Sequence, residues 1–176
     1  EADEMLDRGF AHDVEAILAA TPRERQTALF AATLPDWVAK TAHKHLRNPQ
    51  TVALDTDVHS PPEIEHIVYE VDKPQKLDVL MTFLDRREGQ VIVFGRTKRG
   101  VKQLARRLND LGYPSDALQG NLSQNARERV LEQFRSCKVP ILVATNVAAR
   151  GLDIQGIEQV INFDLPDSES LFTHRT

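Results

Sequence analysis

The sequence predicts an α/β protein built around a parallel β-sheet. Short apolar runs alternate with segments of helical spacing along most of the chain, a pattern typical of βαβ units. In addition, the apolar run over residues 139–144 leads into a polar loop that contains Arg150, Gly151 and Asp153. Ligands of open α/β sheets bind beyond the carboxyl ends of the strands, so we expect this loop to belong to a site.

One interruption of the pattern predicts two domains. Residues 55–62 carry Asp, His, Ser and a Pro-Pro pair with almost no apolar content, which is typical of a linker. We therefore expect a first domain over residues 1–54 and a second over residues 63–176.

The first domain is expected to run helix, strand, helix, strand. Apolar residues at one-face spacing mark its first helix, which Thr21-Pro22 ends: Phe10, Val14, Ile17 and Leu18. The following predictions are a strand over 26–32, a helix over 36–46 and a strand over 51–54.

The second domain is expected to alternate strands with helices. Its predicted strands are 64–71, 90–94, 115–119, 140–144 and 159–163. Its predicted helices are one over 75–87, one that follows Thr97 and ends near Gly112, and one that follows Ser123 with Val130, Leu131 and Phe134 inside. Thr97 and Ser123 precede the last two helices, where a hydroxyl can accept a hydrogen bond from an otherwise unpaired N–H group of the first turn.

Charge is uneven along the chain, although the total of −4 does not indicate a nucleic-acid-binding protein. Residues 1–60 hold 6 Lys and Arg against 10 Asp and Glu, whereas residues 61–176 hold 16 of each kind. Six basic residues crowd one short region: Arg96, Lys98, Arg99, Lys102, Arg106 and Arg107. Such a stripe can hold phosphates, but taken alone it is better explained as a solvated helix face.

Composition argues against several classes of protein. Cys137 is the single cysteine, which excludes an internal disulfide and a cysteine-rich zinc site and suits the reducing cytosol. No apolar run approaches the roughly 20 residues that span a bilayer, and no secretory leader is visible. We expect a cytoplasmic protein without a membrane partner.

The segment 139–154 resembles a signature of superfamily 2 helicases, specifically of DEAD-box RNA helicases. Further resemblances follow in that family's order, at 1–10, 27–35, 91–98, 118–134 and 172–176. The resemblance implies the second RecA-like domain, the C-terminal helicase domain, preceded by the C-terminal part of the first.

The resemblance also implies catalytic roles near the ends of the chain. Glu1 would orient the attacking water and serve the magnesium ion indirectly, through water. Asp3 would link to the next motif, in which Thr33 keeps its hydroxyl. His174 would couple toward Asp3, and Arg175 would support the interface.

ATP, Mg²⁺ and RNA are the ligands that the resemblance implies. Arg150, Gly151 and Asp153 would contact ATP, with Asp153 at the ribose. The RNA-binding residues would be Arg96, Thr97, Gly120, Asn121, Gln124, Arg127 and Thr145. Contacts to the RNA backbone predict little sequence preference, and local duplex unwinding would be coupled to ATP hydrolysis.

Departures from the family pattern leave other functions open. Ala31 replaces a Ser and Asn146 an Asp. The Gly-x-x-x-x-Gly-Lys-Ser/Thr phosphate loop, the leading Asp of the DEAD motif and the arginine fingers are not in this sequence, so we expect the isolated chain not to hydrolyse ATP. One alternative is a non-catalytic RNA-binding or partner-docking module, and another is a DNA helicase of the same superfamily.

Overall fold

The computed structural model describes most of the chain and divides it into two compact units. The described residues are 2–7, 9–31, 36–53, 64–149, 154, 156–168, 171, 172 and 175. The first unit comprises residues 1–61 and the second residues 62–176. The predicted linker at 55–62 lies outside the described residues, and we describe each unit by itself.

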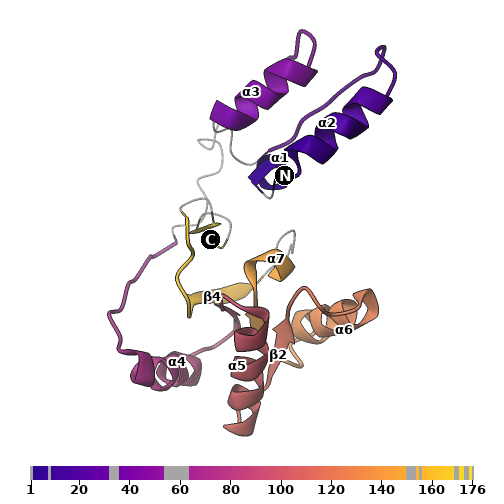
Figure 1. Cartoon of the computed structure of the whole chain (residues 1–176). Coiled ribbons are helices and arrows are strands. Elements are labelled where there is room, and N and C mark those ends of the chain that lie inside the picture. Colours follow the sequence, from indigo (N-terminus) through magenta and orange to yellow (C-terminus); the bar gives the residue numbers. More distant parts are fainter. Residues whose placement is uncertain are drawn as a thin grey trace. The chain divides into compact units, whose positions relative to one another are not determined.

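The first unit contains three described helices: α1 (Ala2–Asp7), α2 (Ala11–Ala20) and α3 (Asp36–His45) (Figure 1). Helix α2 ends where the sequence indicates, because the Thr21 hydroxyl donates to the Leu18 carbonyl across 2.7 Å. The predicted helices of this unit are therefore confirmed.

The two strands predicted for the first unit are not present. Residues 26–31 and 50–53 belong to no strand, although both are rich in residues that favour strands. A strand is stabilised by hydrogen bonds to a neighbouring strand, and the described part of this unit supplies none. The core is correspondingly small, since Val38 is the one buried apolar side chain among the unit's described residues.

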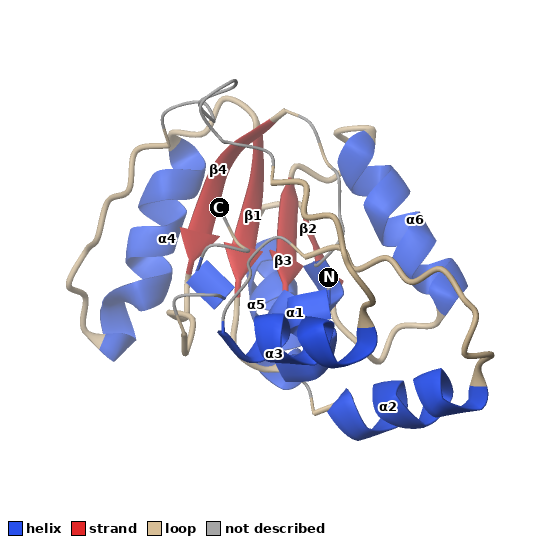
Figure 2. Ribbon diagram, turned by 90° about the horizontal axis from the view of Figure 1, so that it is seen from above, coloured by secondary structure: helices blue, strands red, loops and turns tan. Residues whose placement is uncertain are grey.

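The second unit is built on a four-stranded parallel sheet in the order β2-β3-β1-β4 (Figure 2). The strands are β1 (Gln90–Phe94), β2 (Ser115–Leu118), β3 (Ile141–Ala144) and β4 (Ile157–Asn162). Val93 of the central strand lies opposite Val143 on one side and Ile161 on the other. These strands confirm the predicted α/β fold class, with shifts of a residue or two at their ends.

Helices cover both faces of this sheet. They are the short 3₁₀ helix η2 (Lys73–Gln75), α4 (Lys76–Asp85), α5 (Lys98–Asp110), α6 (Gln124–Arg135) and α7 (Asn146–Ala149). Alternate residues of β1 point to opposite faces. Val91 and Val93 pack with α4 and α5, whereas Ile92 and Phe94 pack with α6 and α7. Burial on both faces explains why β3 and residues 91–94 of β1 are apolar.

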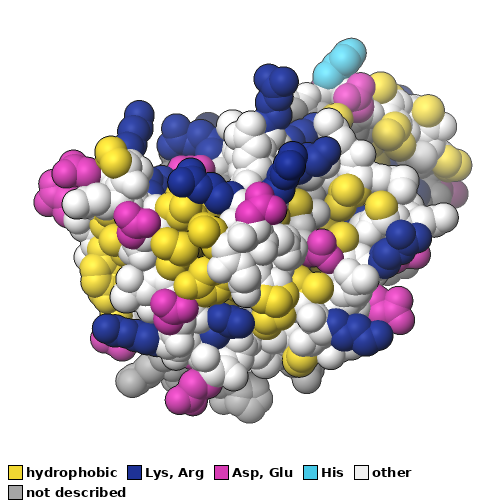
Figure 3. All heavy atoms as spheres, turned by 90° about the horizontal axis from the view of Figure 1, so that it is seen from below, with side chains coloured by type: hydrophobic (Ala, Val, Ile, Leu, Met, Phe, Trp, Pro, Cys, Tyr) yellow, Lys and Arg dark blue, Asp and Glu magenta, His cyan; other side chains and the backbone are white. Residues whose placement is uncertain are grey.

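The strand predicted at 64–71 is wrong. This segment forms no strand, and Ile67, Val68 and Tyr69 are exposed. Its described ring contact with α4 joins Tyr69 to Phe83, with ring centroids 5.0 Å apart. The apolar pattern indicates that the segment favours burial, but pairing requires a partner strand, and no described strand pairs with it. Figure 3 shows one face of the molecule, on which apolar side chains are exposed between acidic and basic ones.

No helix in the described ranges has the length and apolarity to cross a membrane.

Candidate functional site

The carboxyl ends of the four parallel strands meet at one edge of the second unit. Backbone hydrogen bonds join the turns just beyond them: Gly95 N–H to Ala144 O (3.0 Å), Thr145 N–H to Leu118 O (3.1 Å) and Asp164 N–H to Phe94 O (3.1 Å). The turns that follow β1, β2, β3 and β4 therefore lie side by side. This is the edge at which ligands of open α/β sheets bind.

The turn after β1 presents cations at the start of α5. The Thr97 hydroxyl caps this helix by accepting from the Gly100 N–H (3.0 Å), which confirms the predicted cap. Arg96 and Lys98 flank the cap and are exposed. Helix N-termini attract anions through free N–H groups and the helix dipole, so these residues suit a phosphate.

The turn after β2 is attached to the turn after β1. Lys98 Nζ donates to Asn121 Oδ1 across 2.8 Å, and Asn121 N–H donates to Gln119 Oε1 across 2.8 Å. A Cβ atom on Gly120 would lie 3.4 Å from Lys98 Cε, so the glycine allows a close approach. The structure thus brings the predicted residues Arg96, Thr97, Gly120 and Asn121 together through Lys98, which the prediction omitted.

Helix α6 carries the two remaining predicted RNA ligands of this cluster. Ser123 caps the helix by accepting from Ala126 N–H (3.3 Å), as predicted. Gln124 Nε2 donates to Glu128 Oε1 across 2.8 Å, and Arg127 is half-buried. In this structure the Gln124 amide is therefore paired within its own helix.

Thr145 is buried where β3 passes into α7. Its side chain is 6% exposed, and its hydroxyl has no hydrogen-bond partner among the described residues. Its carbonyl accepts from the N–H groups of Ala148 (3.0 Å) and Ala149 (3.1 Å), which forms the short helix α7. A buried hydroxyl without a partner costs free energy, so a ligand that reaches it would remove that cost.

Arg175 is the most enclosed cation among the described residues, at 6% exposed. Its Nε donates to Asn146 Oδ1 (2.7 Å), and one terminal nitrogen donates to Asn162 Oδ1 (2.5 Å) and to the Asp164 carbonyl (2.8 Å). The guanidinium carbon lies 4.8 Å from the centre of the Phe94 ring. Burial lowers the pKa of Arg175, against the opposing charges of Asp164 and Asp167, but the group stays a cation.

Asp164 joins three segments, and the sequence prediction missed it. Its carboxylate accepts from Lys76 Nζ (2.8 Å) and from the Arg96 N–H (3.0 Å). Burial raises the pKa of Asp164, but the hydrogen bonds from Lys76 and Arg96 and their positive charges outweigh burial, so the pKa lies below its usual value. Asp164 follows the carboxyl end of β4 as a polar residue. The same pattern predicted a site in the loop after β3, so it could have indicated Asp164 as well.

Several predicted site residues lie outside the described residues. They are Glu1, Thr33, Arg150, Gly151, Asp153 and His174. Asp3 is described and is buried in α1 of the first unit. The coupling between Asp3 and His174 stays a prediction. So does the magnesium role of Glu1, which lies outside the described residues.

Comparison with known proteins identifies the family to which the chain is similar. The family model for the helicase conserved C-terminal domain matches residues 72–176. A DEAD-box ATP-dependent RNA helicase CshA from Geobacillus kaustophilus is 46% identical over 176 residues, which cover 99% of this chain and 38% of that protein. An ATP-dependent RNA helicase CshA from Listeria monocytogenes is 42% identical, with 99% and 34% covered.

Solved structures show the same relationship. The S. cerevisiae Dbp5 structure bound to RNA and ADP BeF3 matches 99% of this chain and 47% of its own, with a TM-score of 0.80 and 30% identity. A DEAD box protein from Methanococcus jannaschii matches 99% of this chain and 47% of its own, with a TM-score of 0.62 and 36% identity. The chain thus spans less than half of each of these relatives, three of which are DEAD-box proteins or RNA helicases by name. Since the family model matches more than half of it, the chain belongs to the helicase conserved C-terminal domain family.

Proposed function

We propose that this chain is part of an ATP-dependent RNA helicase. Its second unit would bind the RNA backbone, and its first unit would be part of the domain that hydrolyses ATP. One observation carries the proposal: the turns after the parallel strands place a capped helix N-terminus, flanking cations and a buried, unpartnered Thr145 hydroxyl at one edge of the sheet. The names of the relatives, which specify RNA and ATP, support the choice of ligand.

RNA would lie across this edge, held by its sugar–phosphate backbone. Arg96, Lys98 and the N-terminus of α5 would bind one phosphate, and Asn121 and Arg127 would lie beside the next. Thr145 would donate its free hydroxyl to a phosphate oxygen. Backbone contacts predict weak sequence preference, and contacts to 2′-hydroxyl groups would favour RNA over DNA.

ATP and Mg²⁺ would bind where the two halves of the longer protein meet. We assign Arg150, Gly151 and Asp153 to the nucleotide on the resemblance. Glu1, Asp3, Thr33, His174 and Arg175 would serve hydrolysis and its coupling to unwinding, which we expect in the cytoplasm. ATP binding would bring the two halves of the longer protein together, and hydrolysis with phosphate release would let them separate.

The RNA contacts can be tested by measuring affinity against salt. We expect the double variant Arg96→Ala with Lys98→Ala to bind a fluorescent single-stranded RNA more weakly. The slope of the logarithm of the binding constant against the logarithm of the salt concentration should become shallower by about 0.7 for each lost phosphate contact. Lys102→Ala with Arg106→Ala removes the same charge further along α5 and should leave both quantities nearly unchanged. An equal loss in both variants would reject the proposed contacts.

The proposal of a motor fragment can be tested by adding the missing part. The chain alone should release no phosphate from ATP with RNA present. The chain fused to the part of the Geobacillus kaustophilus relative outside the matched stretch should show RNA-stimulated release. A fusion that binds RNA without hydrolysis would favour the non-catalytic RNA-binding alternative. A preference for DNA duplexes in strand separation would favour the DNA helicase.

A further inference from the structure

Acidic side chains already engage two of the predicted RNA-binding donors. A terminal nitrogen of Arg96 lies 3.2 Å from a carboxylate oxygen of Asp167. On α6, Gln124 Nε2 donates to Glu128 Oε1 across 2.8 Å. Carboxylate and phosphate oxygens are similar partners for a guanidinium or an amide N–H group, because both are anionic acceptors. Each carboxylate therefore offers its donor the kind of partner that an RNA phosphate would provide.

The fold brings Asp167 to Arg96 from a neighbouring strand. β1 and β4 are adjacent and parallel, with Phe94 opposite Asn162, so the turns beyond them lie at the same edge of the sheet. In the turn after β4, the Asp164 carboxylate accepts from the Arg96 N–H across 3.0 Å. Asp167, three residues later, reaches the side chain of the same arginine. The turn after β4 thus holds both the backbone and the guanidinium of Arg96.

Stability does not account for the pair of Arg96 with Asp167. The two side chains are 60% and 71% exposed. Ion pairs as exposed as this one contribute little to the free energy of unfolding, because water and salt screen the charges. The same exposure leaves the guanidinium within reach of a ligand, so the main effect of the pair is expected on binding.

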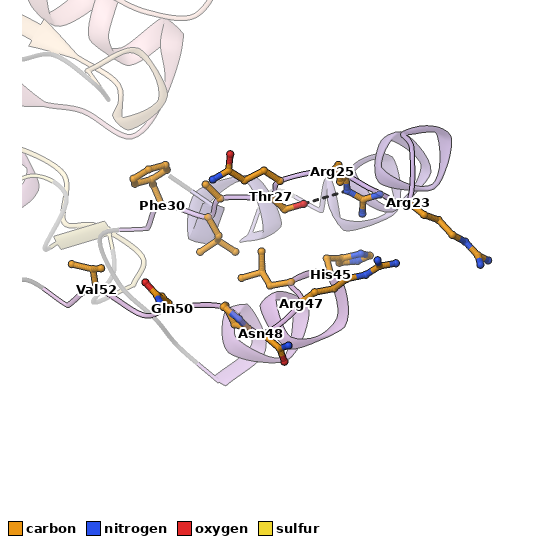
Figure 4. Close-up of a pocket in the computed structure, with 14 residues that line it drawn as sticks. Arg23, Arg25, Thr27, Phe30, His45, Arg47, Asn48, Gln50 and Val52 are labelled. Atoms are coloured by element: carbon orange, nitrogen blue, oxygen red, sulfur yellow. Dashed lines mark hydrogen bonds between the residues drawn. The ribbon is translucent and has the colours of Figure 1, made fainter.

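Several other cations of the chain lack such a carboxylate partner. Lys102 and Arg106 lie further along α5, and neither forms an ion pair with any described residue. Basic side chains also line a cavity of about 630 Å³ in the first unit, and none of the described residues that line it is acidic (Figure 4). There, Arg25 donates to the Thr27 hydroxyl and to two backbone carbonyls. Pairing with a carboxylate is therefore not a general property of the basic side chains.

We propose that Asp167 and Glu128 act as built-in competitors of RNA at this site. Without RNA, their carboxylates occupy Arg96 and Gln124, and an arriving phosphate has to displace them. A competitor on the same chain has a high effective concentration, so it lowers RNA affinity although each contact is weak. It also takes up the donor when a phosphate leaves, which favours release of the RNA. This inference rests on the proposed function and names the residues that set the strength of its RNA contacts.

Binding of a fluorescent single-stranded RNA to the complete chain tests the role of Asp167. We expect Asp167→Asn to lower the dissociation constant about two- to fivefold. Asp167→Glu keeps a carboxylate and should retain the parent value. Because removing any acid near RNA weakens repulsion, Asp167→Asn is also made in Arg96→Ala, where the pair is already absent and no gain is expected. A gain that persists in Arg96→Ala, or no gain in the parent, would overturn the proposal.

Glu128 is tested in the same way on α6. Glu128→Ala should lower the dissociation constant about twofold, and this gain should vanish in Gln124→Ala. Glu132→Ala is the matched control, because it removes an equal exposed charge one turn further along α6 and should bind RNA like the parent. Equal gains from Glu128→Ala and Glu132→Ala would indicate general repulsion and reject the competition.

These outcomes separate the inference from the proposed function. Arg96→Ala alone should weaken RNA binding, and an unchanged dissociation constant would refute the RNA contact together with the competition. If Arg96→Ala weakens binding but Asp167→Asn does not strengthen it, the RNA contact stands and the competition is rejected. Thermal unfolding of Asp167→Asn should match that of the parent, so that its gain in affinity reports on binding.

Discussion

The guanidinium of Arg175 donates to the side-chain oxygen of Asn146 across 2.7 Å, although 29 residues separate them in the chain. The same cation donates to Asn162 and to a backbone carbonyl, so all three of these acceptors are neutral. The resemblance to DEAD-box helicases places an Asp where this chain has Asn146. Here a nearly buried cation is held by amide and carbonyl dipoles, without a direct carboxylate partner in these contacts.

Replacing Asn146 by Asp should stabilise the second unit. Hydrogen bonds between a cation and a carboxylate are stronger than those to a neutral amide. We expect Asn146→Asp to raise the unfolding free energy by about 1 kcal/mol and the melting temperature by about 5 °C, measured by urea and thermal unfolding at pH 7. Gln103→Glu adds the same charge on an exposed face of α5 and should change stability much less. A less stable Asn146→Asp variant would show that desolvation of the new carboxylate dominates.

Removing the Thr97 hydroxyl should weaken both the fold and the proposed RNA contact. Its Oγ1 accepts from Gly100 N–H, and loss of such a cap typically costs about 1 kcal/mol. Thr97→Ala should therefore lower stability and RNA affinity together, whereas Thr97→Ser should retain both. Ser123→Ala removes the equivalent cap of α6 at a similar cost in stability. If Ser123→Ala lowered RNA affinity as much as Thr97→Ala, the special role of the α5 N-terminus would be refuted.

Asp164 should make the second unit sensitive to acid. Its folded pKa lies below the usual value, so its stabilising contribution is complete above the unfolded pKa of about 4 and is lost as pH falls through the folded pKa. The side chain is 34% exposed, so we expect Asp164→Asn to cost only about 1 kcal/mol at pH 7 and to flatten the decline in stability below about pH 5.

Two variants separate this contribution from general charge effects. Asp167→Asn removes an exposed carboxylate, 3.2 Å from Arg96, and controls for the loss of one negative charge near Asp164. The pKa of Asp116 is raised by burial, so its contribution has the opposite sign, and Asp116→Asn should be more stable than the parent at pH 7. Unfolding curves from pH 2 to pH 8 would test both; an unchanged acid decline in Asp164→Asn would refute the role of Asp164.

Adding a methyl group at Gly95 should strain the turn after β1. A Cβ atom there would lie 2.9 Å from Val101 Cγ2, too close for both to stay in place. Overpacking of this kind typically costs about 1 to 3 kcal/mol, so Gly95→Ala should unfold at lower urea concentration. Gly120→Ala is the control, since its Cβ would meet only the flexible end of Lys98. Equal stability of the two variants would show that Val101 moves aside without cost.

Local chemistry explains what could be predicted from the sequence. The four strands of the second unit, the capping roles of Thr97 and Ser123 and the helices between them follow from apolar spacing and from hydroxyls placed before helices. Those interactions span only a few residues. The resemblance to helicases likewise depends on short motifs of consecutive residues, and it indicated the family that the comparisons show.

Pairing between distant residues could be decided only by the tertiary structure. The bond from Lys76 to Asp164 spans 88 residues and the bond from Lys98 to Asn121 spans 23, so no local pattern indicates either. The same limit explains the errors in the strands predicted at 26–32, 51–54 and 64–71. Apolar composition shows that a segment favours burial in a sheet, but a strand forms only where a neighbouring strand completes its hydrogen bonds, and that neighbour is set by the fold.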